Sequence, residues 1–128
     1  MDPLQLSIKA NNANGTALRA SARGWMQTQK VRADTTEDVL LVLSELFSNA
    51  VTASRTGAVV DVHLTSGADG EIQVSVTNTG LAFDLERVPA PTLDRRGGRG
   101  LAIAQAIGSL HVRHRDGRTM VAVDIVRS

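Results

Sequence analysis

The chain has 128 residues, of which 42% are hydrophobic and 21% charged, with a formal net charge of +1. This composition is typical of one globular domain over residues 1–128 and excludes a disordered chain. A charge so close to zero provides no basic field for nucleic acid, and the absence of cysteine excludes disulfides, a thiolate nucleophile and a cysteine-based zinc site.

The first half of the chain reads as one strand followed by two helices. Alternating Leu4, Leu6 and Ile8 predict a strand, without the long apolar run of a signal peptide or membrane span. We therefore expect a cytoplasmic protein. A weak helix is predicted over residues 16–29. The "DTTE" segment reads as a capping box, with Asp34 at the N-cap of a second helix that runs to about Ser54.

The second half reads as two hairpins separated by a long loop and a short helix. "TGAVVDVHLTS" and "EIQVSVTN" form the first hairpin around a "GADG" turn. An irregular stretch over 79–98 precedes a helix predicted over 99–108. "LHVRHR" and "TMVAVDIV" form the second hairpin around "DGR". This order predicts an α/β sandwich, with a mixed, mostly antiparallel sheet of about five strands covered on one face by three helices.

The second helix carries a short polar stripe on an otherwise apolar surface. Glu45, Ser48, Asn49 and Thr52 fall at helical spacing and so share one face. An ordinary solvated face is one interpretation, although the stripe has no Lys or Arg. The other interpretation is a site in which the Asn49 oxygen binds a hard cation and Glu45 orients a water.

The segment "LDRRGGRGLAIAQAIG", residues 93–108, places glycines and arginines directly before a helix. A helix start offers unpaired N–H groups and glycines let the backbone approach a ligand, so an anion site is one interpretation. A solvated basic loop is the other. A loop of roughly twenty residues before it is typical of a lid over a phosphorylated ligand.

The remaining polar residues indicate no second site. His63, His111 and His114 fall on predicted strands, and His111 and His114 are three residues apart, so they point to opposite faces and share no metal. The serines show no His–acid relay that would support nucleophilic catalysis.

Taken together and in order, "ELFSNA", "VTNTG", "GGRGLAIA" and "GRTMVAVDI" resemble the GHKL superfamily of ATP-binding domains, found in histidine kinases, gyrase B and MutL. The chain is most similar to the small anti-sigma-factor serine/threonine kinases of that superfamily. The resemblance extends over nearly the whole chain and implies the Bergerat ATP-binding fold.

The resemblance assigns roles to residues on three segments. Glu45 corresponds to the general base and Asn49 to the Mg²⁺ ligand. Asn78, Gly80 and Thr119 correspond to residues around the adenine. The phosphate-proximal turn and the helix after it correspond to Gly98, Arg99, Gly100 and Leu101, and Arg96 is a candidate phosphate contact.

The implied function is binding of Mg·ATP, sequestration of a sigma factor, and phosphorylation of a Ser or Thr on an antagonist protein. The resemblance also allows a homodimer. Two departures favour an alternative, a nucleotide-binding interaction module without turnover. Asn78 stands where the family usually has Asp, and Leu81 and Ala82 replace a Pro–Gly pair in the first lid hinge. A further departure is Ala53, which stands where related sequences often have His.

Overall fold

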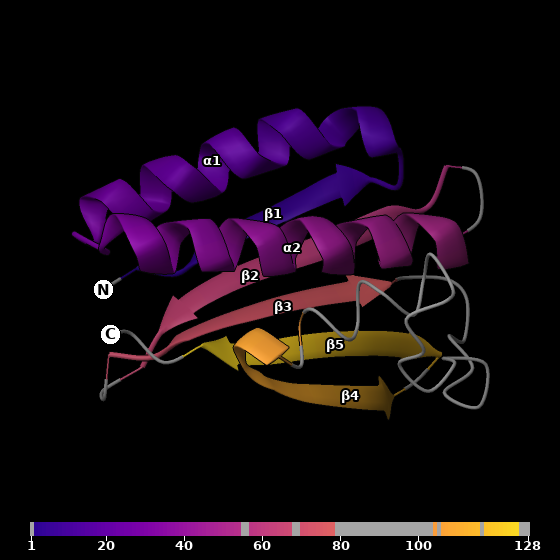
Figure 1. Ribbon diagram of the computed structural model, residues 1–128. Helices are drawn as coiled ribbons and strands as arrows, with labels where there is room; N and C mark the ends of the chain where they lie inside the picture. Colours follow the sequence, from indigo (N-terminus) through magenta and orange to yellow (C-terminus); the bar gives the residue numbers. More distant parts are fainter. Residues whose placement is uncertain are drawn as a thin grey trace.

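Two long helices lie side by side on one face of a five-stranded sheet (Figure 1). The computed structural model describes residues 2–54, 57–67, 70–78, 104, 106–115 and 117–125. The helical elements are η1 (Asn12–Asn14), α1 (Gly15–Thr28) and α2 (Ala33–Ala53). The strands are β1 (Leu4–Lys9), β2 (Val59–Ser66), β3 (Ile72–Asn78), β4 (Ser109–Arg115) and β5 (Arg118–Ile125).

The sheet has the order β1-β2-β3-β5-β4, and every neighbouring pair is antiparallel. The α/β sandwich and its five strands are therefore confirmed, whereas the expected mixture of strand directions is wrong. Both hairpins of the chain pair as predicted, and β1 adds to β2 at one edge. Both hairpins join strands that are neighbours in the sheet, as antiparallel strands joined by short turns are.

Two of the three predicted covering helices, α1 and α2, lie wholly within the described residues, whereas most of the third lies outside them. Of the third predicted helix, 99–108, the structure describes Ala104 and residues 106–108. Ala104, Ala106 and Ile107 are helical, and the Gly108 N–H donates to the Ala104 carbonyl at 2.9 Å. A Cβ on Gly108 would overlap the Asp124 carbonyl oxygen, so this short turn packs directly on the β5 backbone.

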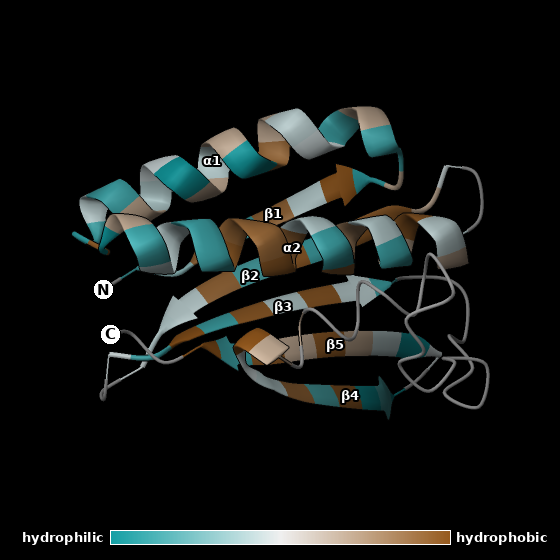
Figure 2. Ribbon diagram, viewed as in Figure 1, coloured by the Kyte–Doolittle hydropathy of each residue, from teal (hydrophilic) through white to brown (hydrophobic). Residues whose placement is uncertain are grey.

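The core lies between the helices and the sheet and is aliphatic, as the scarcity of aromatic residues predicts. Figure 2 shows the alternation of apolar and polar residues along the strands. The apolar positions point toward the helices, where α2 contributes the largest share. Fully buried members on α2, β2 and β3 include Val39, Leu43, Leu46, Val62, Leu64 and Val74.

The start of α2 differs from the predicted capping box. The helix begins at Ala33 with Arg32 at the N-cap, and Arg32 makes no side-chain capping bond. Asp34 lies inside the first turn, where its carboxylate accepts the Thr35 N–H at 2.8 Å. Glu37 does not reach back to the helix start; its carboxylate pairs with Arg23 of α1 at 2.9 Å. The acid in the first turn still complements the helix dipole.

The β4–β5 hairpin turns at Gly117, whose φ of 74° is left-handed backbone that glycine adopts without strain. The turn pairs Arg115 with Arg118 and then His114 with Thr119.

No helix within the described residues is long and apolar enough to cross a membrane.

Candidate functional site

The polar stripe of α2 lies at the boundary between its buried and exposed faces. Glu45 and Asn49 are half-buried, whereas Ser48 and Thr52 are exposed. The four-residue spacing stacks the Glu45 carboxylate and the Asn49 amide on one flank, one turn apart. The Thr52 hydroxyl donates to the Ser48 carbonyl at 3.0 Å and so remains within its own helix. Glu45 and Asn49 are therefore the members of the stripe placed to meet a ligand.

The side chain of Asn49 has a buried nitrogen without a hydrogen-bond partner among the described residues. Its Nδ2 is buried and has no hydrogen-bond partner within the part of the chain that the structure describes. A buried amide without a partner costs about 1–3 kcal/mol, and a bound ligand removes that cost by supplying the missing contact. The amide fits the polar, oxygen-rich surroundings that a nucleotide and its cation would bring.

The described residues alone do not provide enough ligands for a cation beside Asn49. No three His, Cys, Asp or Glu side chains among the described residues gather closely enough to hold a metal. Mg²⁺ takes six oxygen ligands and commonly keeps waters and substrate phosphates among them. Asn49 would therefore hold the ion together with nucleotide oxygens and water, rather than in a cage made by the protein.

A row of polar side chains crosses the end of the sheet on the face that the helices cover. Asn78 of β3 pairs with Thr119 of β5, and Thr119 pairs with His114 of β4. Asn78 is only 4% exposed and Thr119 only 2%. The Thr119 hydroxyl lies 2.7 Å from His114 Nδ1. Asn78 and Thr119 are thus two buried, hydrogen-bonded polar residues at the end of an otherwise aliphatic face.

Ser54 ties the end of α2 to this row. Its hydroxyl oxygen lies 2.6 Å from the Ala50 carbonyl oxygen and 2.9 Å from Asn78 Oδ1. The hydroxyl has a single hydrogen, so it donates to one of these oxygens at a time. When Ser54 donates to Ala50, the Asn78 amide turns its NH₂ toward Ser54 and leaves its oxygen for a ligand. A 180° rotation of the amide exchanges the two, so Asn78 offers either an acceptor or a donor.

This hydrogen bond joins the end of α2, the helix that carries Asn49, to the end of β3, which carries Asn78. Asn49 precedes Ser54 by five residues, about 7.5 Å along the helix axis. Figure 1 shows that α2 ends beside the end of β3, where β5 begins. Glu45 and Asn49 thus lie on the helix whose C-terminal end meets the row of Asn78 and Thr119.

Ser54 and His114 are site residues that the sequence analysis did not identify. For His114 a signal was present, because the two-residue turn of "RDGR" fixes the register that puts His114 opposite Thr119. Ser54 carried no such signal, because its contact with Asn78 spans 24 residues and needs the helix to be docked.

The histidines behave as expected from their spacing. His111 Nε2 lies 3.2 Å from Asp124 on the face of the sheet away from the helices, whereas His114 meets Thr119 on the other face. The candidate residues Gly80, Arg96, Gly98, Arg99, Gly100 and Leu101, and the departures Leu81 and Ala82, lie outside the described residues.

Solved structures share this fold. The RsbU and RsbW domains of a Mycobacterium tuberculosis protein align with a TM-score of 0.75 and 21% identity over 99% of this chain and 33% of that one. The blue-light activated histidine kinase of Erythrobacter litoralis gives 0.63 and 23% over 77% and 32%. A chain of the SiaB–SiaC complex from Pseudomonas aeruginosa gives 0.66 and 15% over 95% and 88%. The chain thus spans about a third of the first two.

No match was found among curated proteins. A family model described as histidine kinase-like ATPase domain matches residues 8–125, which is nearly all of the chain. That match extends from β1 to the end of β5 and includes both α2 and the row at the end of the sheet. The chain belongs to the histidine kinase-like ATPase domain family.

Proposed function

We propose that this chain is an ATP-binding regulatory protein that binds Mg·ATP between the C-terminal half of α2 and the end of the sheet. The observation that carries the proposal is the pair of buried polar residues, Asn78 and Thr119, tied to α2 through Ser54. The buried Nδ2 of Asn49, a donor without a partner among the described residues, gives independent support for a ligand that brings acceptor oxygens, as phosphates do. Membership of an ATPase-domain family agrees with this ligand.

In the proposed site each described residue has one task. Asn78 and Thr119 form hydrogen bonds with the adenine. Asn49 binds the cation that neutralises the phosphates. Glu45 accepts the proton of a Ser or Thr hydroxyl on the antagonist as that oxygen takes the γ-phosphoryl group, and ADP leaves. Such transfer depends mainly on positioning and charge neutralisation. Gly80, Arg96, Gly98, Arg99, Gly100 and Leu101 complete the proposal by resemblance to the family.

The proposed partners are a sigma factor, which the protein sequesters, and an anti-sigma antagonist, which it phosphorylates. A homodimer and a cytoplasmic location belong to the same proposal. Support comes from the likeness to anti-sigma-factor kinases and from structures of related fold that carry RsbW or assemble as SiaB–SiaC.

A second candidate function is a nucleotide-binding interaction module without turnover. The observation that favours it is the amide of Asn78, since Ser54 competes for the group that an adenine amino group would need. A base held through such a shared contact is positioned less firmly than one bound by a carboxylate.

Binding of adenine nucleotide is the first test. ATP or ADP should raise the melting temperature of the purified chain in an Mg²⁺-dependent way, because a ligand that binds only the native state stabilises it by mass action. The measurement is a thermal melt with ATP, ADP or GTP, with and without Mg²⁺, followed by calorimetry. Millimolar ATP that shifts neither signal would overturn the proposed site.

Restoring the family's usual acid at the base-reading position should tighten ATP binding. A carboxylate at residue 78 accepts both the Ser54 hydroxyl and an adenine amino group, so Asn78→Asp should lower the ATP Kd roughly fivefold, about 1 kcal/mol. Gln5→Glu is the matched control, because it adds the same charge on the face of β1 away from the helices. Equal ATP affinity in wild type and Asn78→Asp would show that residue 78 does not read the adenine.

A further inference from the structure

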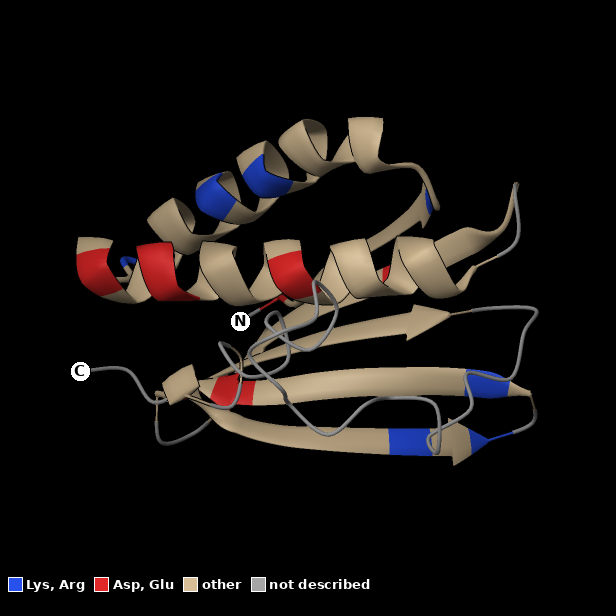
Figure 3. Cartoon of the chain, turned by 45° about the vertical axis from the view of Figure 1, so that its right-hand side comes forward, with Lys and Arg blue, Asp and Glu red and all other residues tan. Residues whose placement is uncertain are grey.

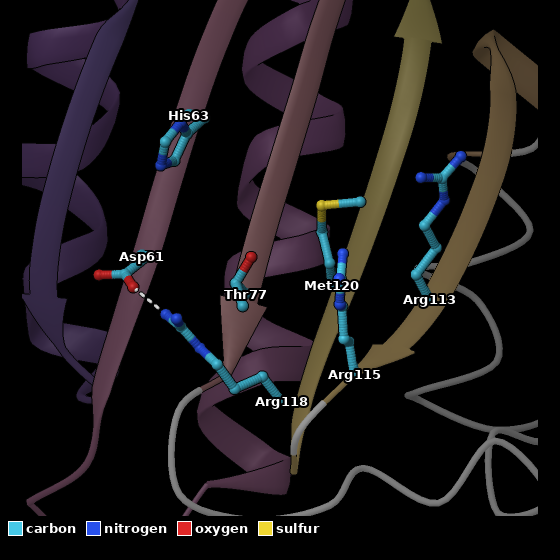
Figure 4. A pocket seen from close by; sticks show the side chains of 7 residues that line it. All are labelled: Asp61, His63, Thr77, Arg113, Arg115, Arg118 and Met120. Carbon is cyan, nitrogen blue, oxygen red and sulfur yellow. Dashed lines mark hydrogen bonds and ion pairs between the residues drawn. The ribbon is translucent and has the colours of Figure 1, made fainter.

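The face of the sheet away from the helices carries a hollow that the proposed function does not use. It measures about 440 Å³ and is lined by seven side chains from β2, β3, β4 and β5, all drawn in Figure 4. Thr77 and Met120 lie toward its middle, and three arginines stand around them. No helix among the described residues covers this face, since α1 and α2 both pack on the other one.

The described lining residues of this hollow carry more positive than negative charge. Asp61 is its one acid among the described lining residues, and it accepts from Arg118 at 2.7 Å and from Ser7 at 2.7 Å. Arg113 and Arg115 are exposed and make no ion pair within the described part of the chain. Among the described residues, two guanidinium groups of this shallow surface thus have no carboxylate partner.

The other described acid of β4 and β5 lies away from these arginines. Asp124 lies at the opposite end of β5 and is bound by Gln73 and His111. Asp116, in the hairpin turn, lies outside the described residues. Figure 3 shows basic residues gathered at one end of β4 and β5, and acidic residues along α2 in the other layer. The basic residues of the sheet are thus concentrated at the end of β4 and β5 that borders the hollow.

The arrangement of the arginines selects the kind of anion. Figure 4 shows that the three side chains do not converge: Arg118 reaches toward Asp61, Arg115 extends beside Met120, and Arg113 rises from β4 at the edge. A single phosphate needs donors that converge on one point. Separated guanidinium groups instead match carboxylates spaced along a chain, each of which they bind with a planar fork of donors.

The size of the surface fits a short extended segment. From β2 to β4 the sheet has three steps of about 4.8 Å, which is about 14 Å or the length of about four extended residues. We propose that the face formed by Arg113, Arg115, Arg118, Thr77 and Met120 binds an acidic segment of a partner protein. Asp61 limits that binding, because it repels the segment and holds Arg118.

This proposal is independent of nucleotide binding, because the two sites lie on opposite faces of the sheet. The probe is a fluorescein-labelled peptide of about eight residues in which Glu and Ser alternate, titrated by fluorescence anisotropy at low salt. Converting Arg113 and Arg115 together to Glu should weaken peptide binding roughly tenfold or more. Asp61→Asn should strengthen it roughly two- to fivefold, because it releases Arg118 and removes the repulsion.

The control is Arg19→Glu on α1, which makes on the helical layer the charge change of one of these two substitutions and should leave peptide affinity unchanged. Thermal melts by circular dichroism establish that each variant folds. Undiminished binding by the double arginine variant, or equal binding of a peptide with Gln in place of Glu, would overturn the proposal. So would saturable binding of inorganic phosphate that the same arginine variant abolishes, since the hollow would then be a site for a small anion.

Discussion

Replacing Glu45 by Gln is expected to slow phosphoryl transfer to a Ser-bearing antagonist by roughly 10²–10⁴-fold while ATP affinity stays unchanged. The proposed role of Glu45 is to take the proton of the attacking hydroxyl, and a neutral amide does not accept it. Gln keeps the size of the side chain, and the half-buried Glu45 makes no hydrogen bond or ion pair with another described side chain. Single-turnover transfer of label from ATP to the antagonist measures the step directly.

Glu37→Gln provides the matched control on the same helix. It removes a carboxylate two turns before Glu45, where the group is exposed and pairs with Arg23. Loss of an exposed ion pair should change the free energy of unfolding by about 1 kcal/mol at most and leave the transfer rate intact. Equal transfer by Glu45→Gln and wild type would show that Glu45 is not the base. Wild-type protein that binds ATP and antagonist yet transfers nothing would favour the interaction module.

The strands and hairpins could be predicted from local sequence because their determinants are local. Alternation places Val60, Val62 and Leu64 on the helix-covered face, and the glycine of "DGR" supplies the left-handed turn. The first residue of α2 was harder to predict from the sequence. An aspartate can accept a backbone N–H of the first turn from the N-cap position, but Asp34 does so from inside the helix. Capping patterns identify a helix start but leave its position uncertain by a residue or two.

Some residues of the candidate site could likewise be predicted from local sequence, whereas others depend on contacts between distant segments. Asn49 and Glu45 stand out on α2 through helical spacing alone, and the resemblance supplied Asn78 and Thr119. Ser54 could not be predicted, since its hydroxyl meets Asn78 only after α2 docks on β3. The same holds for the outer hollow, whose arginines come from two strands and meet residues of β2 and β3. Side chains gathered from neighbouring strands depend on register, which local patterns do not encode.

Removing the Asn49 side chain is expected to abolish most of the Mg²⁺-dependent part of ATP affinity while the fold is kept. Outer-shell residues of metal sites commonly contribute about 10- to 100-fold in affinity, and a direct ligand should contribute at least as much. Asn49→Ala also deletes the buried Nδ2 that has no described partner, so the free protein should be destabilised little or even stabilised. A thermal melt without nucleotide and calorimetry with Mg·ATP separate the two effects.

Ser48→Ala is the control, because Ser48 is the adjacent residue on the same helix and is exposed. If the stripe is merely solvated, both substitutions should lie within about 0.5 kcal/mol of wild type and bind Mg·ATP equally. If Asn49 binds the cation, only its replacement reduces affinity, and the loss disappears when ATP is titrated without Mg²⁺. An equal loss with and without Mg²⁺ would instead assign the amide to the nucleotide itself. That result would contradict the role of Asn49 as the ligand of the cation and leave its role in ATP binding intact.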